Sequence, residues 1–158
     1  MIVSKLFVLL FGFLSFSNFG ISKTELPRLS IRYFQSSELT RIPEYFSGEE
    51  FTGKKIFCRS TEAREGIYFS FPIPQSILSG PEDYKVELSI IRNDSSKTEI
   101  FSFSFPEEFE GKTEVFVGIT GKDWPKTDQR LSAWHMAVKD SKGSIIFWKK
   151  SFLWDHEE

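Results

Sequence analysis

Residues 131–154 read LSAWHMAVKDSKGSIIFWKKSFLW. In the first arm Trp134, Met136 and Val138 occupy every second position, which places them on one face of a β-strand. Residues 140–143 supply turn chemistry, because Asp accepts hydrogen bonds from the backbone that follows it and Gly adopts positive φ without a Cβ clash. We therefore predict a β-hairpin that closes an all-β domain.

The second arm of this hairpin carries two adjacent lysines, Lys149 and Lys150, within an apolar run. Lysines of this kind mark edge strands, since they discourage pairing with another chain. We therefore expect an edge or near-edge strand, with the domain ending at Trp154. Burial of a large aromatic side chain is worth about 1.5–3 kcal/mol, so Trp134, Trp148 and Trp154 are expected to anchor the core.

Short apolar runs with period-two alternation also recur upstream, separated by Gly, Pro, Asn and Ser turns. They cover residues 29–33, 56–59, 67–71, 84–90, 101–105 and 115–119. Pro72 and Pro106 end two of them by removing a donor from the strand ladder. No long segment shows a 3.6-residue apolar stripe. The predicted fold is all-β, an immunoglobulin-like antiparallel β-sandwich of about seven or eight strands.

The segment 35–55 is polar and contains Pro43, Gly48 and Gly53. We expect a long connection with one helical turn at residues 43–46, its aromatic side chains packed on an end of the sandwich. The predicted organisation is a single globular domain over 23–154. An N-terminal strand and the long connection occupy 23–55, and the main body occupies 56–158.

Residues 1–22 differ in kind from the rest of the chain. Lys5 precedes an unbroken apolar run at 6–14, and small residues follow it. This order is typical of a secretory signal peptide, with cleavage after Ser17 or Ser22. The alternative is an uncleaved anchor, but the run is shorter than the roughly 20 apolar residues of a spanning helix. We therefore expect a secreted or periplasmic protein whose membrane contact is limited to this segment.

Charge and cysteine content narrow the partners and the compartment. The formal net charge is −2 and no basic patch occurs, which argues against nucleic acid as a partner. Cys58 is the single cysteine, so no intramolecular disulfide can form. A bacterial periplasm or cell surface fits this pattern better than a eukaryotic secretory route. Cys58 itself is expected to be a small buried apolar residue.

Catalytic and metal-binding patterns are scarce. The chain holds two histidines, His135 and His156, and no G-x-S-x-G or phosphate-loop motif,. Carboxylate pairs occur at 49–50, 82–83 and 107–108, each in an expected loop where acidic side chains are solvated. Glycoside cleavage needs two carboxyl groups held across a cleft, which adjacency in sequence does not provide. We predict a protein that is not an enzyme and has no metal or cofactor.

The candidate site lies in the loop at residues 118–128. Lys122, Asp123 and Trp124 stand next to a proline in this loop, and loops at the ends of a sandwich commonly carry binding residues. An exposed Trp124 would grip a peptide or stack on a sugar ring. The alternative is that Trp124 folds back and plugs the end of the sandwich.

These observations favour an exported, non-catalytic β-sandwich module that works through contact with another protein of the bacterial periplasm or cell envelope. One alternative is a carbohydrate-binding module that uses exposed aromatic side chains such as Trp124. A second alternative is a structural subunit that pairs with a partner through an edge strand.

Overall fold

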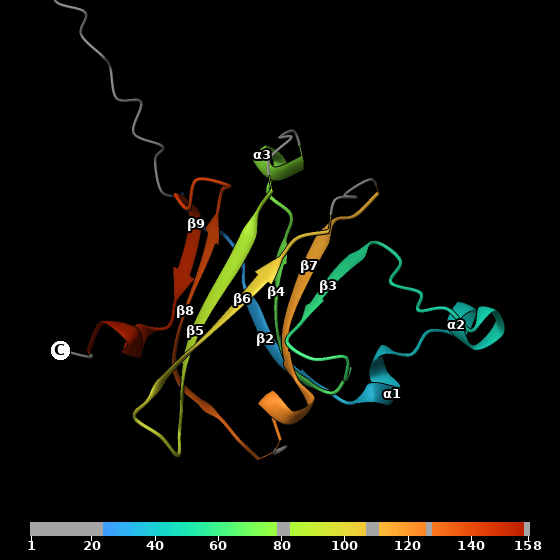
Figure 1. Cartoon of the computed structure of the whole chain (residues 1–158), viewed down its shortest axis with the longest axis horizontal. Coiled ribbons are helices and arrows are strands. Elements are labelled where there is room, and N and C mark those ends of the chain that lie inside the picture. The colour runs from blue at the N-terminus through green and yellow to red at the C-terminus, as the bar shows by residue number, and fades with distance from the viewer. Residues whose placement is uncertain (1–23, 79–82, 107–110, 126–127, 157–158) are drawn as a thin grey trace, which may run out of the picture.

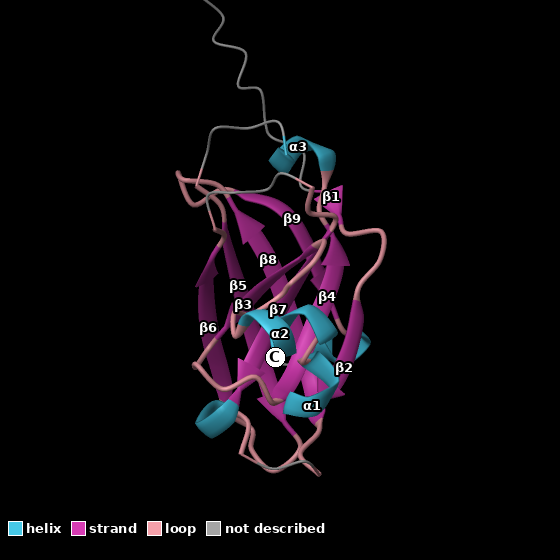
Figure 2. Ribbon diagram, turned by 90° about the vertical axis from the view of Figure 1, so that its right-hand side faces the viewer, coloured by secondary structure: helices cyan, strands magenta, loops and turns pink. Residues whose placement is uncertain are grey.

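A computed structural model describes residues 24–78, 83–106, 111–125 and 128–156. The predicted signal peptide, residues 1–22, lies outside the described residues. The described chain forms two β-sheets packed face to face with little helix (Figures 1 and 2). The expected β-sandwich is therefore confirmed.

The first layer is a five-stranded sheet in the order β1-β9-β8-β5-β6. Its strands are β1 (Thr24–Glu25), β9 (Ile145–Lys150), β8 (Leu131–Lys139), β5 (Lys85–Arg92) and β6 (Thr98–Ser104). The second layer is a four-stranded sheet in the order β2-β4-β7-β3. Its strands are β2 (Ser30–Phe34), β4 (Gly66–Pro72), β7 (Glu114–Thr120) and β3 (Lys55–Arg59).

The expectation of a purely antiparallel sandwich is wrong. β1 runs parallel to β9, and β3 runs parallel to β7. A parallel pair needs a long crossover connection, and both pairs have one, because each joins strands that are not neighbours in the chain. Alternation of apolar residues marks a strand but carries no information about its direction, so the sequence pattern did not reveal these pairs.

The core lies between the two sheets and follows the predicted alternation. Tyr84, Val86, Leu88 and Ile90 are all buried, as expected from the pattern in and before β5. From the facing sheet, β4 and β7 contribute buried apolar side chains at alternate positions: Ile67, Phe69, Phe71, Val115, Val117 and Ile119. Each buried side chain of this size adds about 1.5–3 kcal/mol of favourable transfer free energy.

The closing hairpin forms as predicted. Asp140 accepts hydrogen bonds from the N–H groups of Lys142 and Ser144 at 2.9 and 2.8 Å, and Gly143 has φ +81°. The β9 strand is near the edge of its sheet, covered by the two residues of β1.

The tryptophans of the hairpin do not all anchor the core, which corrects the expectation. Trp134 packs against it. Trp148 pairs in register with Ala137 on the other face of the sheet, where Lys150 lies over its ring. Trp154 follows the strands in η2 (Phe152–His156) and stacks on His135. A register irregularity between Val138 and Lys139 shifts the β9 side chains relative to a strict two-residue period,.

The outer face of the four-stranded sheet carries a second apolar cluster. Tyr68, Phe116 and Leu39 are buried there, with Phe34 and Phe57 packed against them. Tyr68 stands opposite Gly118 in the β4–β7 pairing, and a Cβ at Gly118 would lie 2.4 Å from the Tyr68 ring. The missing side chain of Gly118 therefore makes the space that the tyrosine ring fills.

The segment between β2 and β3 forms two short helices, α1 (Ser36–Leu39) and α2 (Ile42–Ser47), and a third, α3 (Gln75–Leu78), follows β4. The expected helical turn at 43–46 is confirmed by α2. Figure 1 shows α1 and α2 projecting on the side of β3, away from β9, and Figure 2 shows them in front of the strands. None of the helices among the described residues is long and apolar enough to cross a membrane.

The aromatic side chains of this segment do not pack on an end of the sandwich, contrary to expectation. Ile42, Tyr45 and Phe46 are 77%, 83% and 81% exposed, and Phe51 is also exposed. The segment is held to the sheet by Leu39 and by ion pairs rather than by its largest apolar side chains.

We predict that Gly118→Ala lowers the free energy of unfolding by about 1–3 kcal/mol or more, because the new methyl group overlaps the Tyr68 ring,. Urea denaturation measures the change. The same substitution in a Tyr68→Ala background has no ring to meet and is expected to cost much less. Equal costs in the two backgrounds would show that the ring is not what excludes a side chain at this position.

Candidate interaction surface

The predicted site residue Trp124 lies inside the protein. Its side chain is 3% exposed, just after the 3₁₀ turn η1 (Gly121–Asp123), and the Arg92 guanidinium lies 4.8 Å from the centre of its ring. Trp124 belongs to the main core cluster. Of the two arrangements expected for this residue, the structure therefore has the one in which Trp124 folds back into the sandwich.

Arg92 holds this end of the sandwich together. Its guanidinium donates two hydrogen bonds to Glu99 at 2.6 and 2.9 Å, one to Gln129 at 2.7 Å and one to the backbone carbonyl of Asp123 at 2.6 Å. The side chain is buried and has partners for its charge and its donors, as a buried ion needs. Cation–π contact with Trp124 adds to this network.

The other two predicted site residues differ from Trp124 in their surroundings. Lys122 is exposed, and Asp123 takes part through its backbone carbonyl. The hypothesis that this loop stacks on a sugar ring required an exposed Trp124. The buried ring of Trp124 is not available for such stacking. The indole Nε1 of Trp124 has no hydrogen-bond partner among the described residues.

His135 lies on the outer face of the five-stranded sheet. Its ring stacks on Trp154 with centroids 5.7 Å apart, and burial together with the nearby Lys150 lowers its pKa. Ser89 is its register partner on β5, but no hydrogen bond joins the two side chains. Base and nucleophile in a hydrolase commonly share such a bond.

Cys58 is buried, as predicted. Its Sγ atom lies 3.6 Å from the carbonyl oxygen of Ser104 on β6. Burial raises the pKa of the thiol to about 11, although Arg59 lowers it in part. A thiol of this kind is protonated at neutral pH and is a poor nucleophile.

Of the three acidic pairs, the structure describes both members only of the pair at residues 49–50. Glu50 is bound by Arg59, whose hydrogen bond lowers the pKa of that carboxyl. Glu82, Glu107 and Glu108 lie outside the described residues. The part of the chain that the structure describes contains no group of three His, Cys, Asp or Glu side chains placed to share a metal ion.

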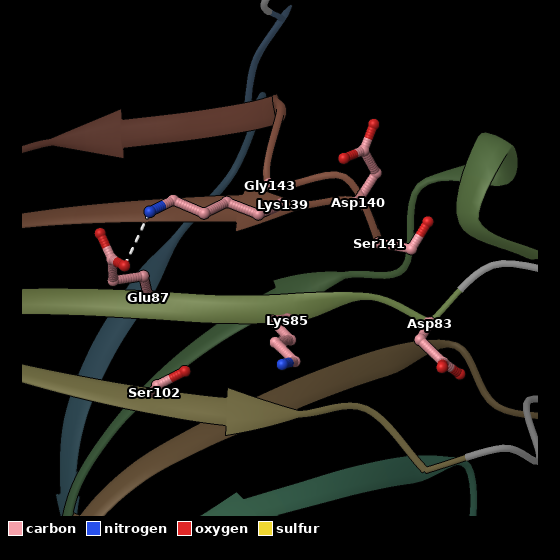
Figure 3. Close-up of a pocket in the computed structure, with 8 residues that line it drawn as sticks. All are labelled: Asp83, Lys85, Glu87, Ser102, Lys139, Asp140, Ser141 and Gly143. Carbon is pink, nitrogen blue, oxygen red and sulfur yellow. Dashed lines mark hydrogen bonds and ion pairs between the residues drawn. The ribbon is translucent and has the colours of Figure 1, made fainter.

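A shallow cavity of about 240 Å³ opens on the outer face of the five-stranded sheet (Figure 3). Lys139 and Glu87 form an ion pair at 2.7 Å along one wall, and the Asp140 carboxylate is bound by its own turn. Lys85 and Asp83 have opposite charges and no ion pair with any described residue. The cavity lining carries three acidic and two basic side chains, so its charges nearly balance.

The outward face of α2, which we define as Ile42, Tyr45 and Phe46, is the feature that stands out. These residues have the i, i+3, i+4 spacing of one helix face, and the rings of Tyr45 and Phe46 meet edge to face at 5.5 Å. Glu44 points the other way and pairs with Arg64. The usual orientation of an amphipathic helix is thus reversed in α2: its charged residue faces the protein and its apolar residues face solvent.

Two arginines fix α2 in this orientation. Arg64 pairs with Glu44, and Arg59 pairs with Glu50 just after the helix. Tyr68 links the two arginines, because its hydroxyl donates to the Arg64 carbonyl at 2.6 Å and accepts from Arg59 Nε at 3.0 Å. The positive φ of Gly48, +73°, ends the helix before the chain returns to the sheet,.

Sequence reasoning missed this surface. The spacing of Ile42, Tyr45 and Phe46 within a polar segment was visible, but large apolar side chains were assumed to be buried. The informative signal is that Glu44 falls on the opposite face of the helix, where Arg64 is its partner of opposite charge. The largest exposed apolar patch of a monomer is often a functional site.

Comparison with protein-family models, with curated proteins and with solved structures finds no match to this chain.

We predict that Trp124→Ala lowers the free energy of unfolding by about 3–5 kcal/mol, because it empties a filled core site and exposes Arg92,. Chemical denaturation measures the loss. The matched control is Lys122→Ala, on the exposed neighbouring side chain, which is expected to stay within about 0.5 kcal/mol of wild type. A Trp124 variant as stable as the control would contradict the structural role.

We also predict that the folded protein resists thiol reagents at pH 8. With a pKa of about 11, only about one Cys58 side chain in a thousand is a thiolate there. Labelling should accelerate strongly in denaturant. Rapid labelling of the native protein would rule out the buried thiol.

The same shift predicts a pH dependence of stability. The pKa of Cys58 rises from 9.0 to about 11 on folding, so the unfolded chain loses the thiol proton first. Stability is then unaffected below about pH 9 and declines as the pH approaches 11. Comparison with Cys58→Ala over this range isolates the contribution of the thiol.

Proposed function

We propose that this chain is an exported, non-catalytic β-sandwich module that binds another protein of the bacterial periplasm or cell envelope through the outward face of α2. The observation that carries the proposal is the inverted helix, in which Tyr45 and Phe46 are more than 80% exposed. Aromatic side chains are enriched at the centres of protein interfaces, where they supply most of the binding energy.

The anchoring of α2 supports this proposal. An exposed apolar face on a loose segment would collapse onto the sheet, but the ion pairs of Arg59 and Arg64 hold the other side of the helix. The contact residues are therefore presented in a fixed arrangement before a partner arrives. Such preorganisation reduces the entropy lost on binding.

The proposed fold type is immunoglobulin-like. Support comes from the path of the chain from β4 onward. It crosses from β4 in the four-stranded sheet to β5 and β6, returns to β7 and ends in β8 and β9. The order β9-β8-β5-β6 facing β4-β7 resembles the strand order of immunoglobulin domains with one added strand,. β3 takes the outer place beside β7 although it comes before β4 in the chain.

Export is proposed from residues 1–22, whose charge, apolar run and small residues follow the pattern of a signal peptide,. The proposal that the protein is not an enzyme is supported by the stacking of His135 on Trp154 and by the buried thiol of Cys58. A hydrolytic activity that disappears on changing His135 would overturn this part of the proposal.

The binding face is tested with a photo-reactive phenylalanine analogue placed at Phe46 in the chain expressed in bacteria. We expect a discrete protein adduct after irradiation. The matched control carries the analogue at Ser132, an exposed position on β8, and should give no such adduct.

The companion experiment replaces Tyr45 by Ser in the protein that carries the analogue at Phe46. We expect the adduct to be lost while circular dichroism and the unfolding midpoint stay close to those of the parent protein, because Tyr45 lies outside the core. The proposal would be wrong if the adduct persisted in the Tyr45→Ser protein. It would also be wrong if the analogue at Ser132 gave an equally strong adduct.

A further inference from the structure

β6 is the outermost strand of the five-stranded sheet, with β5 on one side only. The Phe105 N–H donates to the Tyr84 carbonyl at 3.1 Å, which continues the β5–β6 register. In an antiparallel pair the direction of the backbone groups alternates from residue to residue. The backbone N–H and C=O groups of Phe103, Phe101 and Glu99 therefore point toward β5. Those of Phe105 do so too.

The residues between them direct their N–H and C=O groups away from β5. The carbonyl of Ser104 lies near Cys58 Sγ, which agrees with this alternation. The outward groups of Thr98, Ile100 and Ser102 form no hydrogen bond with another described residue. A stretch of edge from Thr98 to Ser102 is thus open to another strand.

This edge lacks the devices that natural proteins use to prevent pairing, such as a lysine, a proline or a bulge. Its one charged residue is Glu99, whose carboxylate is held by Arg92. Ile100 is 66% exposed, and it is the one exposed large apolar side chain that belongs to a strand among the described residues. It lies at the centre of the open stretch.

The other edges of the described sheets are unsuited to pairing with a copy of themselves. A two-fold axis at the centre of β2 would place Arg32 against a second Arg32. The same operation on β3 would place Lys55 against Arg59. Like charges directly opposite one another destabilise a strand pair. β1 has two residues and offers little edge.

We propose that two copies of this chain pair antiparallel through Thr98–Ser102, joining their five-stranded sheets into one continuous sheet. A two-fold axis at Ile100 places this residue opposite the partner's Ile100, and Thr98 opposite the partner's Ser102. Residues with outward backbone groups then face each other, so that both members of each pair exchange hydrogen bonds. Ile100 is buried against its own copy, and no charges of like sign are opposed.

The shared edge is short, which sets the strength of the dimer. Five residues a side bury less than the roughly 800 Å² per partner of a stable interface. We expect a weak dimer with a dissociation constant on the order of 10–100 µM. Pairing through β6 is independent of the outward face of α2, which belongs to the other sheet's side of the molecule.

Sedimentation velocity over a protein concentration series tests the dimer. Wild type should shift from monomer to dimer across the expected range. Ile100→Lys should remain monomeric, because it sets two lysines face to face. Leu153→Lys, at an exposed apolar position in η2, should dimerise like wild type. A wild type that stays monomeric to about ten times the upper expected constant, or an Ile100→Lys variant that still dimerises, overturns the proposal.

Oxidative cross-linking in a Cys58→Ala background tests the register even if a variant is less stable. Cα atoms of hydrogen-bonded partners lie about 5.5 Å apart, which suits a disulfide. Ile100→Cys should form a covalent dimer, and Thr98→Cys or Ser102→Cys alone should not. The double variant with cysteines at 98 and 102 should cross-link again. Equal cross-linking of all three single variants would overturn the register.

A Tyr45→Ser variant separates this inference from the proposed function. It is expected to dimerise as wild type does while losing the adduct at Phe46. Loss of the dimer in this variant would place the self-contact at α2 and overturn pairing through β6.

Discussion

The fit of the Tyr68 ring over Gly118 governs the outer side of the four-stranded sheet. The ring occupies space that any side chain at Gly118 would fill, and its hydroxyl reaches both Arg59 and the backbone of Arg64. Arg59 binds Glu50, which follows α2, and Arg64 binds Glu44, which lies within α2. A contact between two neighbouring strands thus decides where a helix some twenty residues earlier in the chain is placed. Without the ring, Arg59 Nε loses its acceptor and the Arg64 carbonyl loses its donor.

The interactions that hold α2 differ from those that hold the core. Between the sheets, apolar side chains are removed from water and contribute most of the stability,. At α2, ion pairs hold in place a helix whose apolar side chains remain exposed to water. Partly exposed ion pairs contribute little to stability by themselves, so the arrangement is better understood as positioning.

Residue alternation predicted most strands and the inner face of β5, because Val86, Leu88 and Ile90 had to share a face once β5 was extended. It did not reveal β1, and it did not show that Trp148 lies outside the core. It was not sufficient for strand direction, which depends on crossover connections rather than on local pattern, as β1 and β3 show. For the candidate site, the sequence pointed to Trp124 but did not distinguish a buried ring from an exposed one. That outcome depends on Arg92, which is distant in sequence. The outward face of α2 was hidden by the general expectation that aromatic side chains are buried.

The pairing of β1 with β9 also bears on how the chain reaches its folded state. Lys149 bonds to Glu25 across a separation of 124 residues, and Leu26, fully enclosed in the core, bonds through its N–H to Trp148. Contacts between such distant segments form slowly, because a long loop must close before they are gained. β1 therefore cannot pair until β9 has been synthesised. Shortening either of these two strands removes a hydrogen-bonding partner from the other.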